Sequence, residues 1–361
     1  MPRLCLRPSL LSLLAAAIVS CGGGSGPPGA GGDGEGDAAV AATGGNAGNT
    51  SDTGGSSGPT GGTAGSPTSA SKTRFWSAVA SSADGTKLVA TAAGDFIYTS
   101  ADSGETWSQR ATSQDWMMVA SSADGSKLIA GPIDGYLYTS VDSGLTWTKR
   151  ATRQSWAGVA SSNDGTKLVA VSSSTSPGSI FTSADSGVTW TDAHVSGYWN
   201  SVASSADGTK VVAVGDGIFV STDSGATWTQ NGPKKADAWI SDWFSVASSA
   251  DGSRLIAATG ADWGALYVSG DWGTTWTKTG DVTSWSKVAS SGDGTKLVAV
   301  AGNAFISKDS GATWIQIFSS SIPRCTAMSA DGQKLVIGTG VGVGGNLYTS
   351  TDVGKTWTKR F

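Results

Sequence analysis

Histidine, cysteine and glutamate are scarce in this 361-residue chain, and each shortage removes a class of function. The one histidine, His194, has no candidate metal ligands clustered around it, which argues against a zinc centre. Cys5 falls in the signal-like N-terminal segment and Cys21 at its end, so we expect no internal disulfide partner for Cys325 in the mature chain. After residue 73 the one glutamate is Glu105. The formal net charge of −4 gives no sign of a nucleic-acid partner.

The N-terminal residues have the pattern of a secretion signal. A basic start precedes a largely apolar run over residues 10–19, which is too short to span a bilayer. Residues 18–21 (Ile-Val-Ser-Cys) resemble a bacterial lipobox, which implies that residues 1–20 are a lipoprotein signal peptide and that Cys21 is lipidated. Gly22 implies, by the same analogy, an outer-membrane lipoprotein of the bacterial cell envelope that faces the periplasm or the cell surface. An ordinary secretion signal with an incidental cysteine is the alternative.

Residues 21–72 combine this cysteine with the composition of a disordered linker. They are almost entirely Gly, Ser, Thr, Ala, Pro and Asn, with no aromatic residue. Such a segment cannot bury enough apolar surface to offset the entropy lost on ordering. As a flexible coil it would reach roughly 35–45 Å, which suits a tether. We expect residues 73–361 to form the folded part.

One octapeptide, Ser-x-Asp-x-Gly-x-Thr-Trp, occurs seven times in that part. Its tryptophans follow one another at intervals of 40, 43, 38, 48, 38 and 43 residues: Trp107, Trp147, Trp190, Trp228, Trp276, Trp314 and Trp357. A period near 40 with short strands and glycine-rich turns is typical of a propeller blade, which is one four-stranded sheet. The sequence therefore predicts an all-β fold, a seven-bladed β-propeller with four-stranded blades, preceded by a lipoprotein signal and a disordered linker.

The second repeat shows how one blade would form. Its first strand is predicted over 116–121, an Asp-Gly turn follows at 124–125, and two further strands are predicted over 127–130 and 136–139. The octapeptide then turns the chain and opens the fourth strand at 146–147. Its aspartate can accept hydrogen bonds from the N–H groups of its own turn, and its glycine supplies a positive φ. Its tryptophan can bury about 150–250 Å².

These residues resemble the Asp-box, or bacterial neuraminidase-type (BNR), repeat, and the match covers all seven copies. The resemblance is strongest to bacterial surface lipoproteins of this type; sialidases, xyloglucan-degrading endoglucanases, sortilin-type receptors and a photosystem II assembly factor share the repeat. It implies that the Asp-Gly turns and the octapeptides lie together on the bottom face, and that ligands bind on the top face. Because the repeat itself transfers no activity, we expect the Asp-box aspartates to be structural: Asp102, Asp142, Asp185, Asp223, Asp271, Asp309 and Asp352.

The aspartates outside the repeat positions are the candidates for chemistry. A sialidase would need an arginine triad, a tyrosine nucleophile and a glutamate partner, and Glu105 lies inside an octapeptide, so sialidase activity is not expected. Other glycosidases need two carboxylates roughly 5–9.5 Å apart. No catalytic residue, metal ligand or cofactor is assigned. The aspartates that remain are Asp95, Asp115, Asp134, Asp192, Asp216, Asp237, Asp242, Asp262 and Asp281.

The region where the tryptophan interval stretches to 48 residues is the best candidate for ligand binding. Its longest loop and the loop that follows carry carboxylates and aromatic rings, which can hold a sugar by hydrogen bonding and stacking: Asp237, Trp239, Asp242, Asp262 and Trp263. Neutral loop variation is the alternative. A tryptophan also begins the first strand of six repeats, and it either lines the mouth of the channel or packs between blades: Trp76, Trp116, Trp156, Trp199, Trp243 and Trp285.

We therefore expect a monomeric, lipid-anchored envelope module that binds or scaffolds through its top face. Its partners would be the membrane, through the lipid anchor, and a glycan or a protein, but no nucleic acid. One alternative is a polysaccharide-cleaving glycosidase or lyase that uses top-face aspartates, and another is an assembly factor for an envelope complex. An acid pair beside an aromatic groove would favour the enzyme, whereas exposed tryptophans on a flat top would favour binding.

Overall fold

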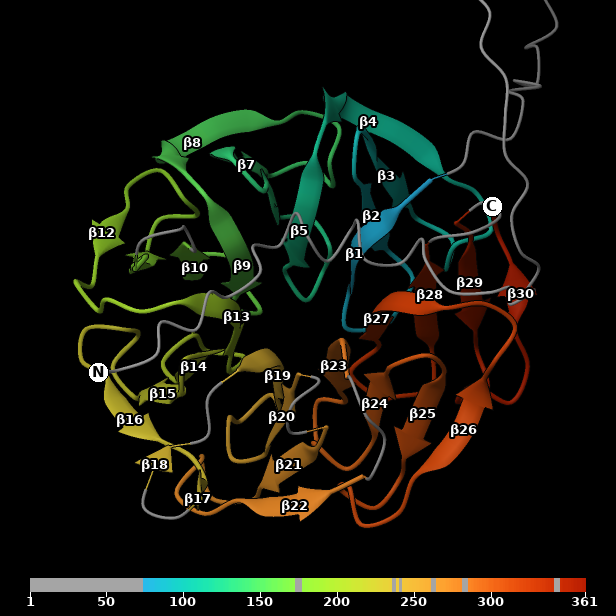
Figure 1. Cartoon of the computed structure of the whole chain (residues 1–361). Coiled ribbons are helices and arrows are strands. Elements are labelled where there is room, and N and C mark those ends of the chain that lie inside the picture. Colours follow the sequence, from blue (N-terminus) through green and yellow to red (C-terminus); the bar gives the residue numbers. More distant parts are fainter. Residues whose placement is uncertain are drawn as a thin grey trace, which may run out of the picture. The chain divides into compact units, whose positions relative to one another are not determined.

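The computed structural model describes residues 74–172, 177–235, 238–239, 242–260, 264–280, 285–340 and 345–361, with the backbone alone at 234–235 and 238–239. Seven four-stranded antiparallel sheets are arranged around a common axis as the blades of a propeller (Figure 1). The regular elements in these ranges are all strands, and they include no helix long and apolar enough to cross a membrane. The predicted fold is confirmed; residues 1–20 and Cys21 lie outside the described residues.

Each blade consists of four strands that follow one another in the sequence from the axis outward (Figure 1). Blades 1 to 4 comprise β1 (Trp76–Ser81), β2 (Leu88–Ala92), β3 (Asp95–Ser100), β4 (Ser108–Gln114); β5 (Trp116–Ser121), β6 (Leu128–Pro132), β7 (Gly135–Ser140), β8 (Thr148–Gln154); β9 (Trp156–Ser161), β10 (Leu168–Ser172), β11 (Ile180–Ser183), β12 (Thr191–Asp192); and β13 (Trp199–Ser204), β14 (Val211–Gly215), β15 (Ile218–Ser221), β16 (Thr229–Asn231). The blades then continue after a short hairpin, β17 (Lys234–Lys235) with β18 (Ala238–Trp239). Blades 5 to 7 comprise β19 (Trp243–Ser248), β20 (Leu255–Thr259), β21 (Leu266–Ser269), β22 (Thr277–Thr279); β23 (Lys287–Ser290), β24 (Leu297–Val300), β25 (Ala304–Ser307), β26 (Ile315–Phe318); and β27 (Pro323–Met328), β28 (Leu335–Thr339), β29 (Leu347–Ser350), β30 (Thr358–Lys359).

Tryptophans at the start of the inner strands form the packing between blades. In six blades this side chain is between 0% and 2% exposed. Trp116 of blade 2, for example, packs in one cluster with Val89 and Ile97 of blade 1 and edge-on against Tyr138 of its own blade, with ring centroids 5.2 Å apart. Blade 7 has Pro323 instead, and Phe318 packs there against Tyr348. The packing interpretation is thus confirmed, and the alternative of an exposed aromatic ring around the channel mouth is wrong, because the rings are covered by neighbouring strands.

The Asp-Gly turns and the octapeptides lie at the same end of the blades, which we call the turn face. In blade 1 the Ser103 N–H donates to the Thr86 carbonyl at 2.8 Å, and this joins the two turns. Around the axis, each Asp-Gly turn also donates one backbone hydrogen bond of 2.7–2.8 Å to the next blade. The bond from Ala330 to Ala83 completes a closed ring of seven: Ala83, Ala123, Asn163, Ala206, Ala250, Gly292 and Ala330.

Blade 7 closes onto blade 1 through side chains from both ends of the described propeller. The inner strands β27 and β1 lie side by side (Figure 1). Arg74 pairs with Asp95 at 3.1 Å, and its guanidinium lies over the ring of Phe361 at 5.0 Å. Phe361 also packs against Trp76, with ring centroids 5.1 Å apart. Phe361, which follows the last strand of blade 7, therefore packs against blade 1.

Candidate functional site

The octapeptide aspartates accept hydrogen bonds from groups of their own turns. Asp102 accepts hydrogen bonds from Ser100 Oγ at 2.7 Å, from Thr106 N at 2.9 Å and from Thr106 Oγ1 at 2.5 Å. The bond from the Thr106 hydroxyl, with those from the Thr106 amide and Ser100, lowers the pKa of Asp102 to about 2. The same bonds recur in the other octapeptides, and within the described residues no three His, Cys, Asp or Glu side chains are grouped as metal ligands. This geometry gives the aspartates a turn-holding role.

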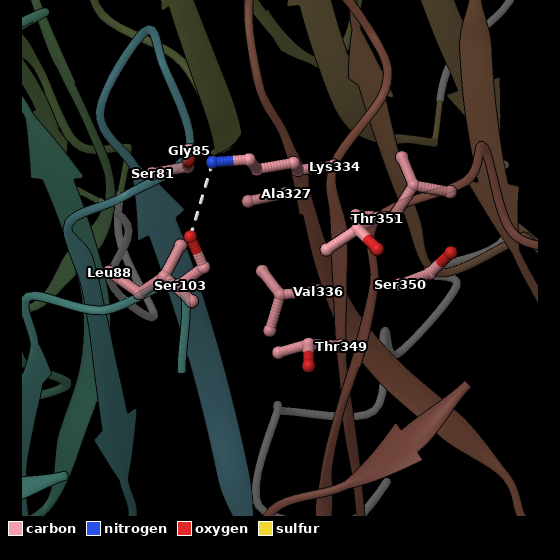
Figure 2. A pocket seen from close by; sticks show the side chains of 11 residues that line it. Ser81, Gly85, Leu88, Ser103, Ala327, Lys334, Val336, Thr349, Ser350 and Thr351 are labelled. Atoms are coloured by element: carbon pink, nitrogen blue, oxygen red, sulfur yellow. Dashed lines mark hydrogen bonds between the residues drawn. The ribbon is translucent and has the colours of Figure 1, made fainter. Parts of the chain in front are cut away.

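Cationic side chains join the turn faces of neighbouring blades. Lys87 donates to Ser143 Oγ of the next octapeptide at 3.3 Å, and Lys334 donates to Ser103 Oγ at 3.2 Å between blades 7 and 1. Figure 2 shows this last contact, which borders a cavity of about 10 Å³ between Ala327 and the octapeptide of blade 1. A cavity of that size holds about one water molecule. The seam is therefore a packed contact between blades and has no room for a ligand.

The structure leaves the predicted binding residues largely untested. Asp237, Asp262 and Trp263 lie outside the described residues, and Trp239 is described by its backbone alone, as the second residue of β18. Asp242 has a φ of 66°, and its carbonyl accepts a hydrogen bond of 2.9 Å from Gly260 N. This bond brings the loop before β19 next to the end of β20. A ligand site in these two loops stays a prediction.

A recess of about 410 Å³ lies at the opposite end of the blades, on what we call the loop face. It is placed there by strand ends, since Ser172 ends β10, Asp192 ends β12 and Gln154 ends β8, all away from the turns. Ligand pockets typically measure about 300–1,000 Å³. The side chains around it come from blades 2 and 3: Gln154, Ser172, Pro177, Gly178, Ser179, Phe181, Asp192, His194 and Ser196.

Asp192 organises this recess. Its Oδ1 accepts hydrogen bonds from Ser179 Oγ and, at 2.7 Å, from His194 N. Its Oδ2 lies 3.7 Å from His194 Nδ1, and the histidine side chain is 87% exposed. The φ of 55° at His194 equals that of Ala111 at the same position of the first repeat, so the backbone there belongs to the repeat and the imidazole is an addition.

The described residues that line the recess supply both hydrogen-bond donors and hydrogen-bond acceptors, and they form no buried ion pair. A carboxylate accepts, an amide does both, and hydroxyl groups do both, so this lining can match a neutral polar ligand with several hydroxyl groups. Sequence reasoning singled out other loops. The sequence signal for the recess was weak. It consists of Asp192, which is one of the nine aspartates outside the repeat positions, and His194, two residues after it.

Comparison with known proteins supports the fold and does not identify a function. No family model matches the chain, and no curated protein sequence matches it. The structure is similar to that of YCF48 from Cyanidioschyzon merolae, with a TM-score of 0.56 and 14% identity over 77% of this chain and 94% of that chain. It also matches the GH74 enzyme of Niastella koreensis, with a TM-score of 0.35 and 19% identity over 76% of this chain and 53% of that chain. The likeness to YCF48 supports the propeller fold alone.

Proposed function

We propose that this chain is a lipid-anchored binding module of a bacterial envelope, and that its loop face binds a glycan. The observation that supports glycan binding is the recess beside blade 3, which has a volume of about 410 Å³ and is lined by Gln154, Asp192 and Ser196 among others. Sugar hydroxyl groups both donate and accept, which suits an amide, a carboxylate and a hydroxyl group. The half-buried ring of Phe181 adds an apolar contact for the carbon face of a sugar.

The anchor rests on the sequence. Residues 18–21 resemble a lipobox, and the segment to residue 72 has the composition of a tether to the propeller at 73–361. The octapeptides support an Asp-box surface lipoprotein, for which the outer membrane is the proposed location. The test is incorporation of radiolabelled palmitate: label should enter the natural chain and be lost, together with membrane association, in Cys21→Ala. A natural chain that takes up no label would contradict the anchor.

Binding is better supported than cleavage. Among the described residues that line the recess, Asp192 is the one carboxylate, whereas glycoside hydrolysis commonly uses two. The loops with Asp237, Trp239, Asp242, Asp262 and Trp263 remain a second candidate surface for the same ligand. A protein partner in an envelope complex is the other alternative, and a polysaccharide screen separates it from the glycan proposal.

The experiment is a screen of the purified full chain against immobilised polysaccharides, with both retention and release of reducing sugar recorded. We expect retention without release. Asp192→Asn and Gln154→Ala should each weaken retention about tenfold, because each removes one or two hydrogen bonds to the ligand. Asp115→Asn is the matched control, since Asp115 is an exposed aspartate between blades 1 and 2 and does not line the recess. Release of sugar would favour the enzyme, and no retention by any polysaccharide would contradict the glycan.

A further inference from the structure

The inner strands of blades 6 and 7 each carry a polar residue that departs from the repeat. Lys287 of β23 pairs with Val300, as Ser245 of β19 pairs with Ala258, so Lys287 occupies the serine position. The other blades have a small or uncharged residue at this position: Ala78, Met118, Gly158, Ser201, Ser245 and Cys325. Thr326 of β27 occupies a position that is valine in the six other blades: Val79, Val119, Val159, Val202, Val246 and Val288.

The lysine position faces the following blade. In blade 5, Ser245 Oγ accepts a hydrogen bond from Val288 N of blade 6 at 3.2 Å. In blade 4, Ser201 Oγ accepts one from Val246 N of blade 5 at 3.4 Å. By the same register, the side chain of Lys287 leaves blade 6 toward blade 7.

The valine position faces the preceding blade. Val288 of blade 6 packs in one cluster with Ile256 and Leu266 of blade 5. Because β23 and β27 are neighbours around the axis, the same register directs Thr326 toward blade 6. Lys287 and Thr326 therefore point into one and the same interface, next to the axis of the ring.

This interface holds polar groups for which the described residues supply no partner. Thr326 is 9% exposed, and its buried Oγ1 has no partner among the described residues. The N–H of Thr326 is the counterpart of Val288 N, which donates to a serine hydroxyl; blade 6 has Lys287 at the position of that serine, and a protonated lysine accepts no hydrogen bond. The Lys287 ammonium has no carboxylate partner in the described part of the chain, although the blades enclose it enough for burial to lower its pKa. An acceptor with negative charge would satisfy the hydroxyl and the ammonium together.

We propose that Lys287 and Thr326 form a site for a small oxyanion, either inorganic phosphate or the carboxylate of a small acid. The ammonium supplies the positive charge. The Lys287 side chain is partly accessible, and its flexible four-carbon stem moves aside so that the anion can enter from the accessible side. The hydroxyl and the amide of Thr326 then donate to the same anion, and these charge-assisted bonds are the strong kind. Arg324, exposed two residues earlier on β27, adds positive charge toward the loop face.

The site is tested by competitive acetylation of the full chain, followed by quantification of labelled lysines by mass spectrometry. Phosphate or acetate should slow labelling of Lys287 severalfold and leave Lys308 unchanged, an exposed lysine on the turn face of the same blade. The anion that protects at the lower concentration identifies the group bound. Thr326→Val restores the residue of the other blades and should weaken the protection severalfold, while Lys287→Ser should abolish the heat of phosphate and acetate binding in calorimetry.

Both variants install residues that this fold already uses at equivalent positions, so they should fold. Equal labelling of Lys287 with and without both anions would overturn the proposal. Equal protection of Lys287 and Lys308 would also overturn it, because that result shows a general effect of ionic strength. Protection that is unchanged in Thr326→Val would remove Thr326 from the site and overturn the assignment.

Discussion

Replacement of Arg74 by Met tests a buried ion pair of blade 1, next to the seam with blade 7. Arg74 Nε lies 3.1 Å from Asp95 Oδ2 and 3.1 Å from Tyr98 OH, and the side chains of Arg74 and Asp95 are 18% and 4% exposed. The methionine keeps much of the apolar stem but removes the guanidinium, and with it both the ion pair to Asp95 and the contact over the Phe361 ring. The variant therefore removes the charged contacts of Arg74 and keeps most of its apolar volume.

The cost follows from what Asp95 retains. Removal of one partner from a buried ion pair costs about 3–5 kcal/mol, because the other charge stays buried. Asp95 keeps a hydrogen bond of 3.2 Å from Tyr98 OH, and the arginine is partly exposed in the natural protein. Both facts reduce the loss, so we expect about 2–3 kcal/mol less free energy of unfolding in Arg74→Met.

The assay is equilibrium urea unfolding followed by tryptophan fluorescence. Arg153→Met is the matched control: the Arg153–Asp134 distance is shorter, at 2.7 Å, but the two side chains are 64% and 54% exposed. An exposed pair contributes about 0–1 kcal/mol. If Arg153→Met lowers the free energy of unfolding as much as Arg74→Met does, burial does not decide how much these ion pairs stabilise the fold, and the reasoning fails.

Three further predictions use the same assay or a simple reagent. Hydrogen bonds within the turn lower the pKa of Asp102 from 3.8 to about 2 and also lower the pKa of the other octapeptide aspartates, so the stability they contribute is present above about pH 4 and is lost as the pH falls toward about 2; a urea midpoint that stays constant over this range would contradict it. Trp116→Ala should cost about 3–5 kcal/mol, because the ring is fully buried, whereas Gln109→Ala on the exposed strand β4 should stay within about 0.5 kcal/mol. Burial raises the pKa of Cys325 to about 12, so in Cys5→Ser/Cys21→Ser the thiol should react with a disulfide reagent only after unfolding; rapid reaction of the folded chain would refute this.

The architecture was predictable because local and long-range signals agree. In the second repeat the first strand is predicted over 116–121, and β5 spans Trp116–Ser121. The fourth strand begins later than predicted, at Thr148 rather than 146, because Trp147 belongs to the turn: its Nε1 donates to Gly144 O at 3.0 Å. The alternation of apolar and polar residues predicts the register of a strand. Where the strand begins or ends depends on side-chain hydrogen bonds such as that of Trp147.

The recess could not be predicted because its residues are brought together only by the ring. Gln154 ends a strand of blade 2, and Asp192 ends a strand of blade 3. The contact between Lys87 and Ser143 is equally invisible in the sequence, since it joins a turn of one repeat to a turn of the next. A repeat pattern shows what each blade shares, whereas these sites depend on how neighbouring blades meet.

The closed ring of backbone hydrogen bonds, from Ala83 round to Ala330 and back, means that the array has no terminal repeat. Open repeat arrays need end caps with a polar outer face, since their last repeats have one uncovered side. Here every blade is covered on both sides, so seven nearly equal units suffice and none has to be specialised as a cap. The place where the chain is cut is therefore arbitrary with respect to packing: a circular permutant that joins Phe361 to Arg74 and opens between blades 3 and 4 would keep all seven blade interfaces.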